Sequence, residues 1–366
     1  MIYLDHASYT ATDPAVLAEF CRVEEEYSAN ALSTHMPGRA VKAEFDRVRA
    51  GIASLLGALP EEIIFTSGAT EANALAIRAH ARTSRHLGKH IITTGLEHPS
   101  VSGPLADLKD QGYEIEMAEI LPDGTMDLEY LGALLRPDTV LLTAPWVDSE
   151  LGAIQPIEEI SKLLAKYPGC RFHVDAAQAV GKVQPVRSSD RLKPDSLKPD
   201  SLSISPHKFH GICGVGILVM TDAMTVHDGT PALALAASAY RALELALSGL
   251  EERSAKVTAL RERIIRELGT KVKINSPING SPYILNLSVP GIKGSDFQAA
   301  LDKRGVCVSV KSACAAQGTP SRAVLAVSRD RKNALASWRL SFSHLTEMSE
   351  AEGFIAAFDE CYEEFK

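Results

Sequence analysis

The chain has 366 residues, of which 45% are hydrophobic and 23% charged, with a formal net charge of −8. This usage is that of an ordinary globular protein and excludes a collagen, a coiled-coil rod and a disordered chain. An acidic balance argues against a protein that binds nucleic acid by neutralising phosphates. We find no apolar run of about 20 residues, no signal-peptide pattern and no C-x-x-C pair. We therefore expect a cytoplasmic enzyme without a membrane span, a disulfide scaffold or a bound metal.

Short apolar runs alternate with longer amphipathic stretches along the first two thirds of the chain. The runs predict strands over residues 62–66, 90–94, 140–143, 171–175, 201–205 and 215–220. The amphipathic stretches predict helices over 71–84, 100–111 and 157–166. Several of the runs are nearly all apolar, as in strands that are buried on both faces of a parallel sheet. The alternation predicts a doubly wound α/β fold.

The pattern changes from residue 231 onward. We expect helices over 231–250, 251–268, 295–304 and 349–362, and strands over 283–289, 306–310 and 337–342. This mixture predicts a smaller α+β unit, with a boundary near residue 250. Residues 192–201 read LKPDSLKPDS, a five-residue unit written twice, and predict a surface loop.

A run of small residues, TSGATEAN at 66–73, follows the first of these strands and opens a helix. Unpaired backbone N–H groups and the helix dipole at such an N-terminus favour an anion such as phosphate. A helix N-cap at Ser67 or Thr70 also explains these residues.

Three polar side chains are expected near the ends of strands. Asp175 would face the ligand crevice of the sheet, although an Asp that caps the next helix fits the same position. Lys208, in the turn SPHK, would suit a Schiff base with a carbonyl cofactor, and a surface charge is the alternative. His98, in EHPS, would share this face and stack on an aromatic cofactor, unless it is a helix cap or a packed ring.

Cys314 lies in a loop of small residues, SACAAQG at 312–318. An accessible thiol in such a loop is a candidate nucleophile, and the nearby Lys311 would favour its thiolate form. The other cysteines are interpreted as incidental: Cys21, Cys170, Cys213, Cys307 and Cys361.

The order of these motifs resembles that of the cysteine desulfurases, which are class V aminotransferases of the fold-type I pyridoxal-phosphate enzymes. The motifs that carry the resemblance are YLDHAS at 3–8, residues 30–35, Gly38 with Ala40, GATEAN, EH, HVDAAQ, SPHK, SAC and RLS at 339–341. They span nearly the whole chain. The resemblance implies a large domain over residues 16–250 with a mainly parallel seven-stranded sheet. It also implies a small α+β domain over 251–366 that carries the cysteine loop, and an N-terminal segment, 1–15, that packs with the small domain.

The resemblance also implies roles for residues around pyridoxal 5'-phosphate. Lys208 would form the Schiff base, Asp175 would pair with the pyridine nitrogen, Gln178 would bind the phenolic oxygen, and His98 would stack on the ring. The remaining cofactor contacts would come from Ala69, Thr70, Ser149, Ser205 and His207, and from Thr230, which would reach the phosphate of the partner subunit in a homodimer.

For the substrate, the resemblance implies that Asn30 and Arg339 bind L-cysteine and that Arg339 clamps its carboxylate. Cys314 would attack the substrate sulfur, leaving alanine and an enzyme persulfide that passes sulfur to an acceptor, for example in iron–sulfur cluster assembly or tRNA thiolation. Two alternatives remain open at this point. One is a transaminase or β-lyase that acts on another amino acid, and the other is a non-catalytic paralogue that serves as a binding partner.

Three positions depart from the family pattern. Ser149 replaces an Asn that normally contacts the cofactor, and Lys311 stands where the cysteine loop usually has Gly. The segment before Gly229 is short, and His227 stands where an Arg is expected.

Overall fold

A seven-stranded sheet lies at the centre of the computed structural model, which describes residues 1–184, 199–221, 230–311 and 318–366. The strand order is β2-β8-β7-β6-β5-β3-β4, and β8 alone runs antiparallel to its neighbours. The strands are β2 (Ile63–Thr66), β3 (His90–Thr94), β4 (Glu114–Ala118), β5 (Thr139–Pro145), β6 (Arg171–Asp175), β7 (Ser201–Ile204) and β8 (Gly216–Met220). The expected mainly parallel seven-stranded sheet is therefore confirmed.

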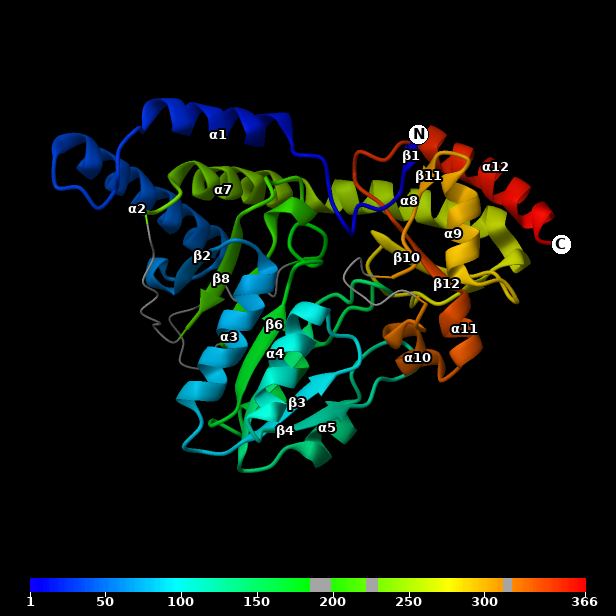
Figure 1. Cartoon of the computed structure of the whole chain (residues 1–366), viewed down its shortest axis with the longest axis horizontal. Helices are drawn as coiled ribbons and strands as arrows, with labels where there is room; N and C mark the ends of the chain where they lie inside the picture. The colour runs from blue at the N-terminus through cyan, green and yellow to red at the C-terminus, as the bar shows by residue number, and fades with distance from the viewer. Residues whose placement is uncertain (185–198, 222–229, 312–317) are drawn as a thin grey trace.

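Helices cover both faces of this sheet (Figure 1). Ile91 and Leu141 pack with α3 (Ala69–Thr83) and α4 (Pro99–Asp110). Their chain neighbours, Ile92 and Leu142, pack with α5 (Leu128–Leu134) and α6 (Ile157–Leu164). Because successive side chains of a strand point to opposite faces, these two sets of contacts explain why the strands are apolar throughout.

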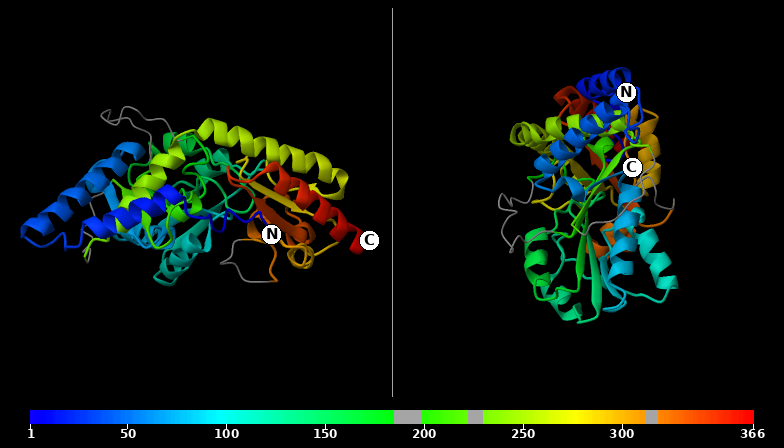
Figure 2. Two further views of the ribbon diagram at one scale, coloured as in Figure 1. Left: turned by 90° about the horizontal axis from the view of Figure 1, so that it is seen from above. Right: turned by 90° about the vertical axis from the view of Figure 1, so that its left-hand side faces the viewer.

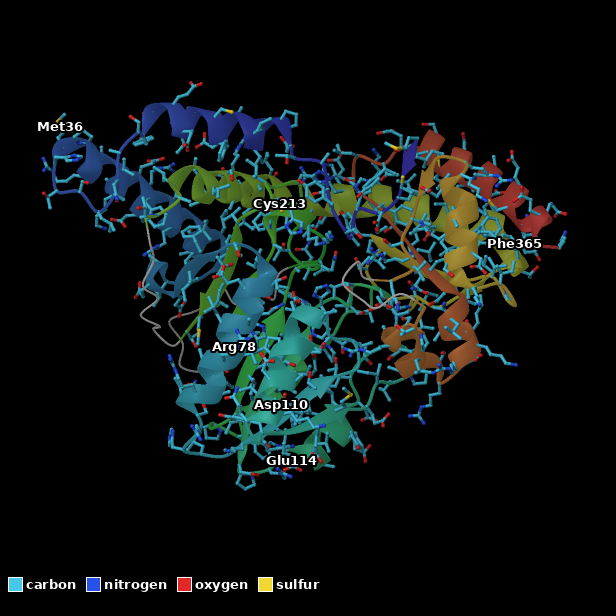
Figure 3. All side chains as sticks on the ribbon, viewed as in Figure 1. Met36, Arg78, Asp110, Glu114, Cys213 and Phe365 are labelled. Carbon is cyan, nitrogen blue, oxygen red and sulfur yellow. The ribbon has the colours of Figure 1, made fainter. Side chains whose placement is uncertain are left out.

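Three further helices pack at one end of the sheet: α1 (Pro14–Glu26), α2 (Met36–Leu56) and α7 (Leu233–Leu247). They form one apolar cluster with β2 and β8. Figure 3 marks Met36 at the start of α2, at the opposite end of the molecule from Phe365. Among the described residues no single helix is long and apolar enough to cross a membrane. Only α7 taken together with residues 250–271 reaches that length and apolar character, and the two are bent by 70° relative to each other.

The C-terminal part has a separate three-stranded antiparallel sheet, in the order β12-β10-β9. Its core holds the stacked rings of Phe297 and Trp338, next to Phe354 and Phe358. The elements are α8 (Leu250–Leu268), η3 (Gly269–Lys271), β9 (Lys273–Ile274), β10 (Ile284–Ser288), α9 (Gly294–Asp302), α10 (Arg322–Ser328), α11 (Arg331–Ala336), β12 (Ser337–Ser341) and α12 (Met348–Glu364). Figure 2 shows this part beside the large sheet.

The N-terminal residues lie against the C-terminal part. β1 (Ile2–Tyr3) pairs in parallel with β11 (Val306–Cys307), and Leu4 is buried in the same core as Trp338. The domain limits at residues 15 and 250 stay a prediction, which these contacts and the bend between α7 and α8 support.

Several predicted strand limits differ from those of the structure, and two of these differences have a visible structural cause. The strand expected over 306–310 ends at Cys307, because Ser309 leaves β1 and forms an isolated bridge with Arg339 of β12. The strand expected from residue 62 begins at Ile63, because Glu62 ends the short 3₁₀ helix η1 (Pro60–Glu62). The LKPDS repeat lies almost entirely outside the described residues, which resume at Pro199.

Gly216, at the start of β8, allows a close approach between strand and helix. A Cβ atom there would lie 2.5 Å from the carbonyl carbon of Gly68, directly before α3. We expect Gly216→Ala to lower the free energy of unfolding by about 1–3 kcal/mol, because the backbone of Gly68 would have to move. Gly132→Ala is the matched control, since its Cβ would meet no atom within 4 Å. Urea unfolding that gives both variants the same stability would contradict this account.

Candidate active site

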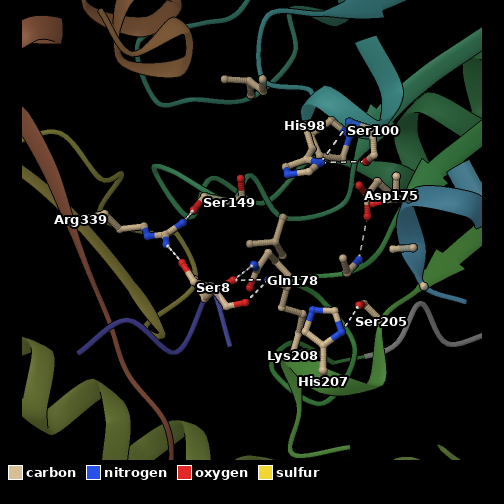
Figure 4. A pocket seen from close by; sticks show the side chains of 18 of the residues that line it. Ser8, His98, Ser100, Ser149, Asp175, Gln178, Ser205, His207, Lys208 and Arg339 are labelled. Carbon is tan, nitrogen blue, oxygen red and sulfur yellow. Dashed lines mark hydrogen bonds between the residues drawn. The ribbon is translucent and has the colours of Figure 1, made fainter. Parts of the chain in front are cut away.

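A cavity of about 360 Å³, here called the site pocket, lies beyond the C-terminal ends of β5, β6 and β7 (Figure 4). Its place and volume are those at which open α/β sheets bind small ligands. Ten of the predicted site residues line it: Ala69, Thr70, His98, Ser149, Asp175, Gln178, Ser205, His207, Lys208 and Arg339.

Two predicted residues, Asn30 and Thr230, are not among the described residues that line the site pocket. Asn30 and Thr230 lie next to each other, with 3.3 Å between the amide nitrogen of Asn30 and the hydroxyl of Thr230. Cys314 lies outside the described residues, as do His227 and Gly229.

Lys208 ends the short 3₁₀ helix η2 (Pro206–Lys208), which follows β7. Its Nζ donates hydrogen bonds to two backbone carbonyls of the N-terminal segment, Ala7 O at 2.8 Å and Ser8 O at 2.5 Å. The surface-charge alternative is therefore wrong, because the amine points into the site pocket (Figure 4).

Asp175 ends β6 and is 8% exposed. Its carboxylate accepts hydrogen bonds from the backbone N–H of Ala177 at 2.9 Å and from Nδ2 of Asn73 at 3.0 Å. These neutral donors hold the group in place without neutralising it. A buried carboxylate held in this way suits a cationic ligand atom.

His98 caps the N-terminus of α4, as one of the sequence alternatives expected. Its Nδ1 accepts a hydrogen bond from the backbone N–H of Ser100 at 3.1 Å. Burial lowers the pKa of His98 and outweighs the opposite effect of Asp175. The ring is therefore neutral near pH 7, and this hydrogen bond places its proton on Nε2. The cap leaves a flat, uncharged ring on the wall of the site pocket.

Donors converge on another part of the site pocket. Ala69 and Thr70 open α3, and the first N–H groups of a helix have no acceptor within the helix. Ser205 Oγ lies 3.1 Å from Nδ1 of His207, and burial lowers the pKa of His207 to about 4. The space beside Gly68 is open, with no atom within 4 Å of where its Cβ would lie, and this arrangement fits a phosphate group.

Arg339 lies on the opposite side of the site pocket from Asp175 (Figure 4). It is 1% exposed, and its guanidinium donates to Asp5 Oδ1 at 2.8 Å, to Ser8 Oγ at 2.9 Å and to the carbonyl of Ser149 at 2.7 Å. The contact with residue 149 uses its backbone, so a serine in place of the family's asparagine preserves this contact.

Sequence reasoning assigned no role to Ala7, Ser8 or Asn73. Asn73 binds Asp175 and is itself held by His173, at 2.9 Å between Nε2 and Oδ1. A buried asparagine inside a helix is unfavourable unless its amide has partners, and this signal was readable in the sequence. The carbonyls of Ala7 and Ser8 leave no signal, because any residue type provides a carbonyl.

A family model for "Aminotransferase class-V" matches residues 2–228 and 222–354. The chain belongs to the class-V aminotransferase family. It is 34% identical to a "NifS/IcsS protein homolog" of Lactobacillus delbrueckii over 100% of this chain and 98% of that protein. It is 34% identical to "Cysteine desulfurase IscS" of Dictyoglomus turgidum over 89% of this chain and 85% of that protein.

Solved structures agree with this class-V aminotransferase assignment. A "NIFS-LIKE PROTEIN" superimposes with a TM-score of 0.89 and 29% identity, covering 98% of each chain. "SspA in complex with cysteine" has a TM-score of 0.80 and 27% identity, with 95% of this chain and 100% of that chain covered. Enzymes of the class-V aminotransferase family depend on pyridoxal phosphate, so the predicted fold, enzyme class and cofactor are confirmed.

Proposed function

We propose that this class-V aminotransferase is a cysteine desulfurase that converts L-cysteine to L-alanine and passes the sulfur to Cys314 as a persulfide. The observation that carries the proposal is that Lys208, Asp175 and Arg339 line one pocket, with the carboxylate and the guanidinium on opposite sides. Relatives that carry the name cysteine desulfurase support the choice of substrate, as does a related structure in complex with cysteine.

The residues of the site pocket fit pyridoxal phosphate. Lys208 would hold it covalently, Asp175 would keep its ring nitrogen protonated, and the neutral ring of His98 would stack on it. When bound, the cofactor supplies an electron sink for negative charge at the substrate carbon next to the amine. The phosphate would lie among the N-terminus of α3, Ser205 and His207.

Lys208 and His98 are the groups placed to move protons. The amine of Lys208 donates hydrogen bonds to the carbonyls of Ala7 and Ser8 and lines the site pocket, where it would be placed to take up or return a proton at the substrate. The neutral ring of His98 has a proton on Nε2 and can offer it in a hydrogen bond to an atom that gains negative charge.

Arg339 is placed to bind the substrate carboxylate. Its planar, always charged guanidinium is held on Asp5 and on the backbone of Ser149, and it forms part of the pocket wall. A two-pronged contact with a carboxylate fixes orientation as well as charge. Asn30, which is not part of this wall and lies next to Thr230, is proposed to assist substrate binding.

We expect Arg339→Lys to lower kcat/KM for L-cysteine by about 10- to 100-fold, because a lysine cannot keep the contacts with Asp5 and Ser149 while it also binds substrate. Steady-state kinetics measures this effect. Arg263→Lys, at a partly exposed ion pair on α8, is the control that should leave kcat/KM unchanged. Equal kcat/KM values for Arg339→Lys and the native enzyme would remove Arg339 from substrate binding.

The sulfur step balances without any further reactant. The Cβ–S bond of the substrate breaks and an S–S bond to Cys314 forms, so that cysteine and an enzyme thiol become alanine and an enzyme persulfide. The Cβ atom of the product takes a proton in place of sulfur. An acceptor thiol then removes the persulfide sulfur.

We further propose a cytoplasmic homodimer that delivers sulfur to an acceptor protein, with iron–sulfur cluster assembly as one destination. The position of Thr230 outside the lining of this subunit's pocket supports the idea that it serves the phosphate of a partner subunit.

The proposal is tested by incubating the holoenzyme with L-cysteine and a reducing thiol. Alanine and sulfide are expected in equal amounts, and L-serine should yield neither product. Difference absorption spectra across a panel of amino acids provide the second arm. A spectral response to non-sulfur amino acids alone would overturn the proposal in favour of a transaminase or β-lyase.

A further inference from the structure

Lys182 is a buried lysine that does not belong to the lining of the site pocket. It is 7% exposed and follows Gly181, whose φ is +73°. A Cβ atom at Gly181 would lie 2.7 Å from Cβ of Ala246 on α7, so the chain passes close to that helix. Residue 182 lies four positions after Gln178, and its side chain returns toward the site pocket.

A chain of hydrogen bonds joins this lysine to the site pocket. Nζ of Lys182 donates to Oε1 of Gln178 at 2.7 Å, and Nε2 of Gln178 donates to the carbonyl of Ala7 at 2.8 Å. The same carbonyl accepts a hydrogen bond from Nζ of Lys208 at 2.8 Å. Gln178 therefore lies between a buried amine and the amine that would hold the cofactor.

The first of these bonds fixes which end of the Gln178 amide faces Lys182. A glutamine amide presents an acceptor oxygen or a donor nitrogen, depending on its rotation, and the two orientations are otherwise similar in shape. Nζ of Lys182 donates to Oε1, and the carbonyl of Ala7 can only accept and so faces Nε2, which fixes the same orientation. The nitrogen is then turned away from Lys182 and carries two hydrogens, of which one binds Ala7.

The surroundings of Lys182 do not favour a charged group. Burial, together with the nearby positive charges of Lys208 and Arg339, lowers its pKa to about 7. The neighbouring His6, His207 and His210 are neutral at pH 7, because burial lowers the pKa of each. An apolar side chain of similar length would avoid the cost of burying an amine. Stability therefore does not explain why residue 182 is a lysine.

We propose that Lys182 is a positioning residue that holds the amide of Gln178 so that its free N–H faces the phenolic oxygen of pyridoxal phosphate. This inference rests on the proposed contact between Gln178 and the cofactor. Lys182 would then contribute to cofactor binding although it does not itself line the site pocket.

The test compares Lys182→Met, Lys182→Gln, Gln178→Met and the double variant with the native enzyme. Lys166→Met, at an exposed lysine after α6, is the matched control for loss of charge. Two properties of each holoenzyme are measured: the dissociation constant for pyridoxal phosphate, and the pH midpoint of its visible absorption band.

We expect Lys182→Met to raise this dissociation constant by about tenfold. We also expect the absorption midpoint to move to higher pH, because the phenolic oxygen loses a donor that stabilises its ionised form. Lys182→Gln keeps a hydrogen-bond donor, so its dissociation constant and absorption midpoint should lie between those of the native enzyme and of Lys182→Met. In the Gln178→Met background, Lys182→Met should add less than about twofold. The thermal unfolding midpoint of cofactor-free Lys182→Met should not be lower than that of the cofactor-free native protein. This comparison separates a positioning role from a structural one.

Additive effects of the two substitutions would overturn the proposal, as would native cofactor affinity and absorption in either Lys182→Met or Gln178→Met. If these shifts appear but L-cysteine yields no alanine, the proposed function fails while the positioning role stands.

Discussion

Lys208→Ala is expected to lower the turnover of L-cysteine by at least about 10⁴-fold, because the amine that we propose holds the cofactor and transfers protons is lost. The substitution also leaves the carbonyls of Ala7 and Ser8 without the donor they share at 2.8 Å and 2.5 Å. An alanine cannot replace either function.

The measurement combines alanine release with mass spectrometry of borohydride-reduced holoenzyme. The native protein should carry the cofactor mass on the peptide that contains Lys208, and Lys208→Ala should carry none. Lys162→Ala, at an exposed position on α6, is the control and should behave as the native enzyme. Cofactor mass on a different peptide of the native enzyme would refute the role of Lys208.

Cys314→Ala is expected to lower sulfide and alanine release by at least about 10³-fold while the protein keeps its bound cofactor and yellow colour. The reason is chemical, since the proposed mechanism then has no thiol to attack the substrate sulfur. Residues on either side of the segment 312–317 are held together, because Nζ of Lys311 donates to Oγ1 of Thr319 at 2.6 Å and to its carbonyl at 3.0 Å. The lysine found in place of the family's glycine thus joins the two ends of the segment that carries Cys314.

Persulfide on the native enzyme is detected after a brief exposure to L-cysteine, as the added mass of one sulfur atom on the peptide that contains Cys314. Cys213→Ala is the matched control, since Cys213 is exposed. Turnover that is unaffected in Cys314→Ala would remove this thiol from the mechanism and favour the β-lyase alternative.

The apolar strands were the most predictable part of the fold. His90–Thr94 and Arg171–Asp175 have the limits that the sequence predicted, because a strand buried on both faces leaves a continuous apolar run. The edge strand Glu114–Ala118 was not predicted, since it is partly exposed and its residues are mixed in character. Helices α1 and α2 were also not predicted, although Pro near the start of each and an apolar stripe were present.

Some of the candidate site residues could also be predicted from the sequence, and others could not. Asp175 and Lys208 could be proposed from the residues alone, because charged side chains near the ends of buried strands are unusual. Arg339 entered only by resemblance, since a single arginine in a C-terminal strand has no pattern that points to a ligand. Lys182 was not proposed at all, because its contact with Gln178 depends on the fold of the turn that joins the two residues.

The N-terminal segment has a consequence for how the two ends of the site respond to each other. Asp5 binds the guanidinium of Arg339, and two positions later the carbonyl of Ala7 holds the amine of Lys208. The guanidinium of Arg339 and the amine of Lys208 are thus both held by one short backbone segment, residues 5–8. Because one short backbone segment holds both groups, a displacement of residues 5–8 would change the hydrogen bonds of Arg339 and of Lys208 together.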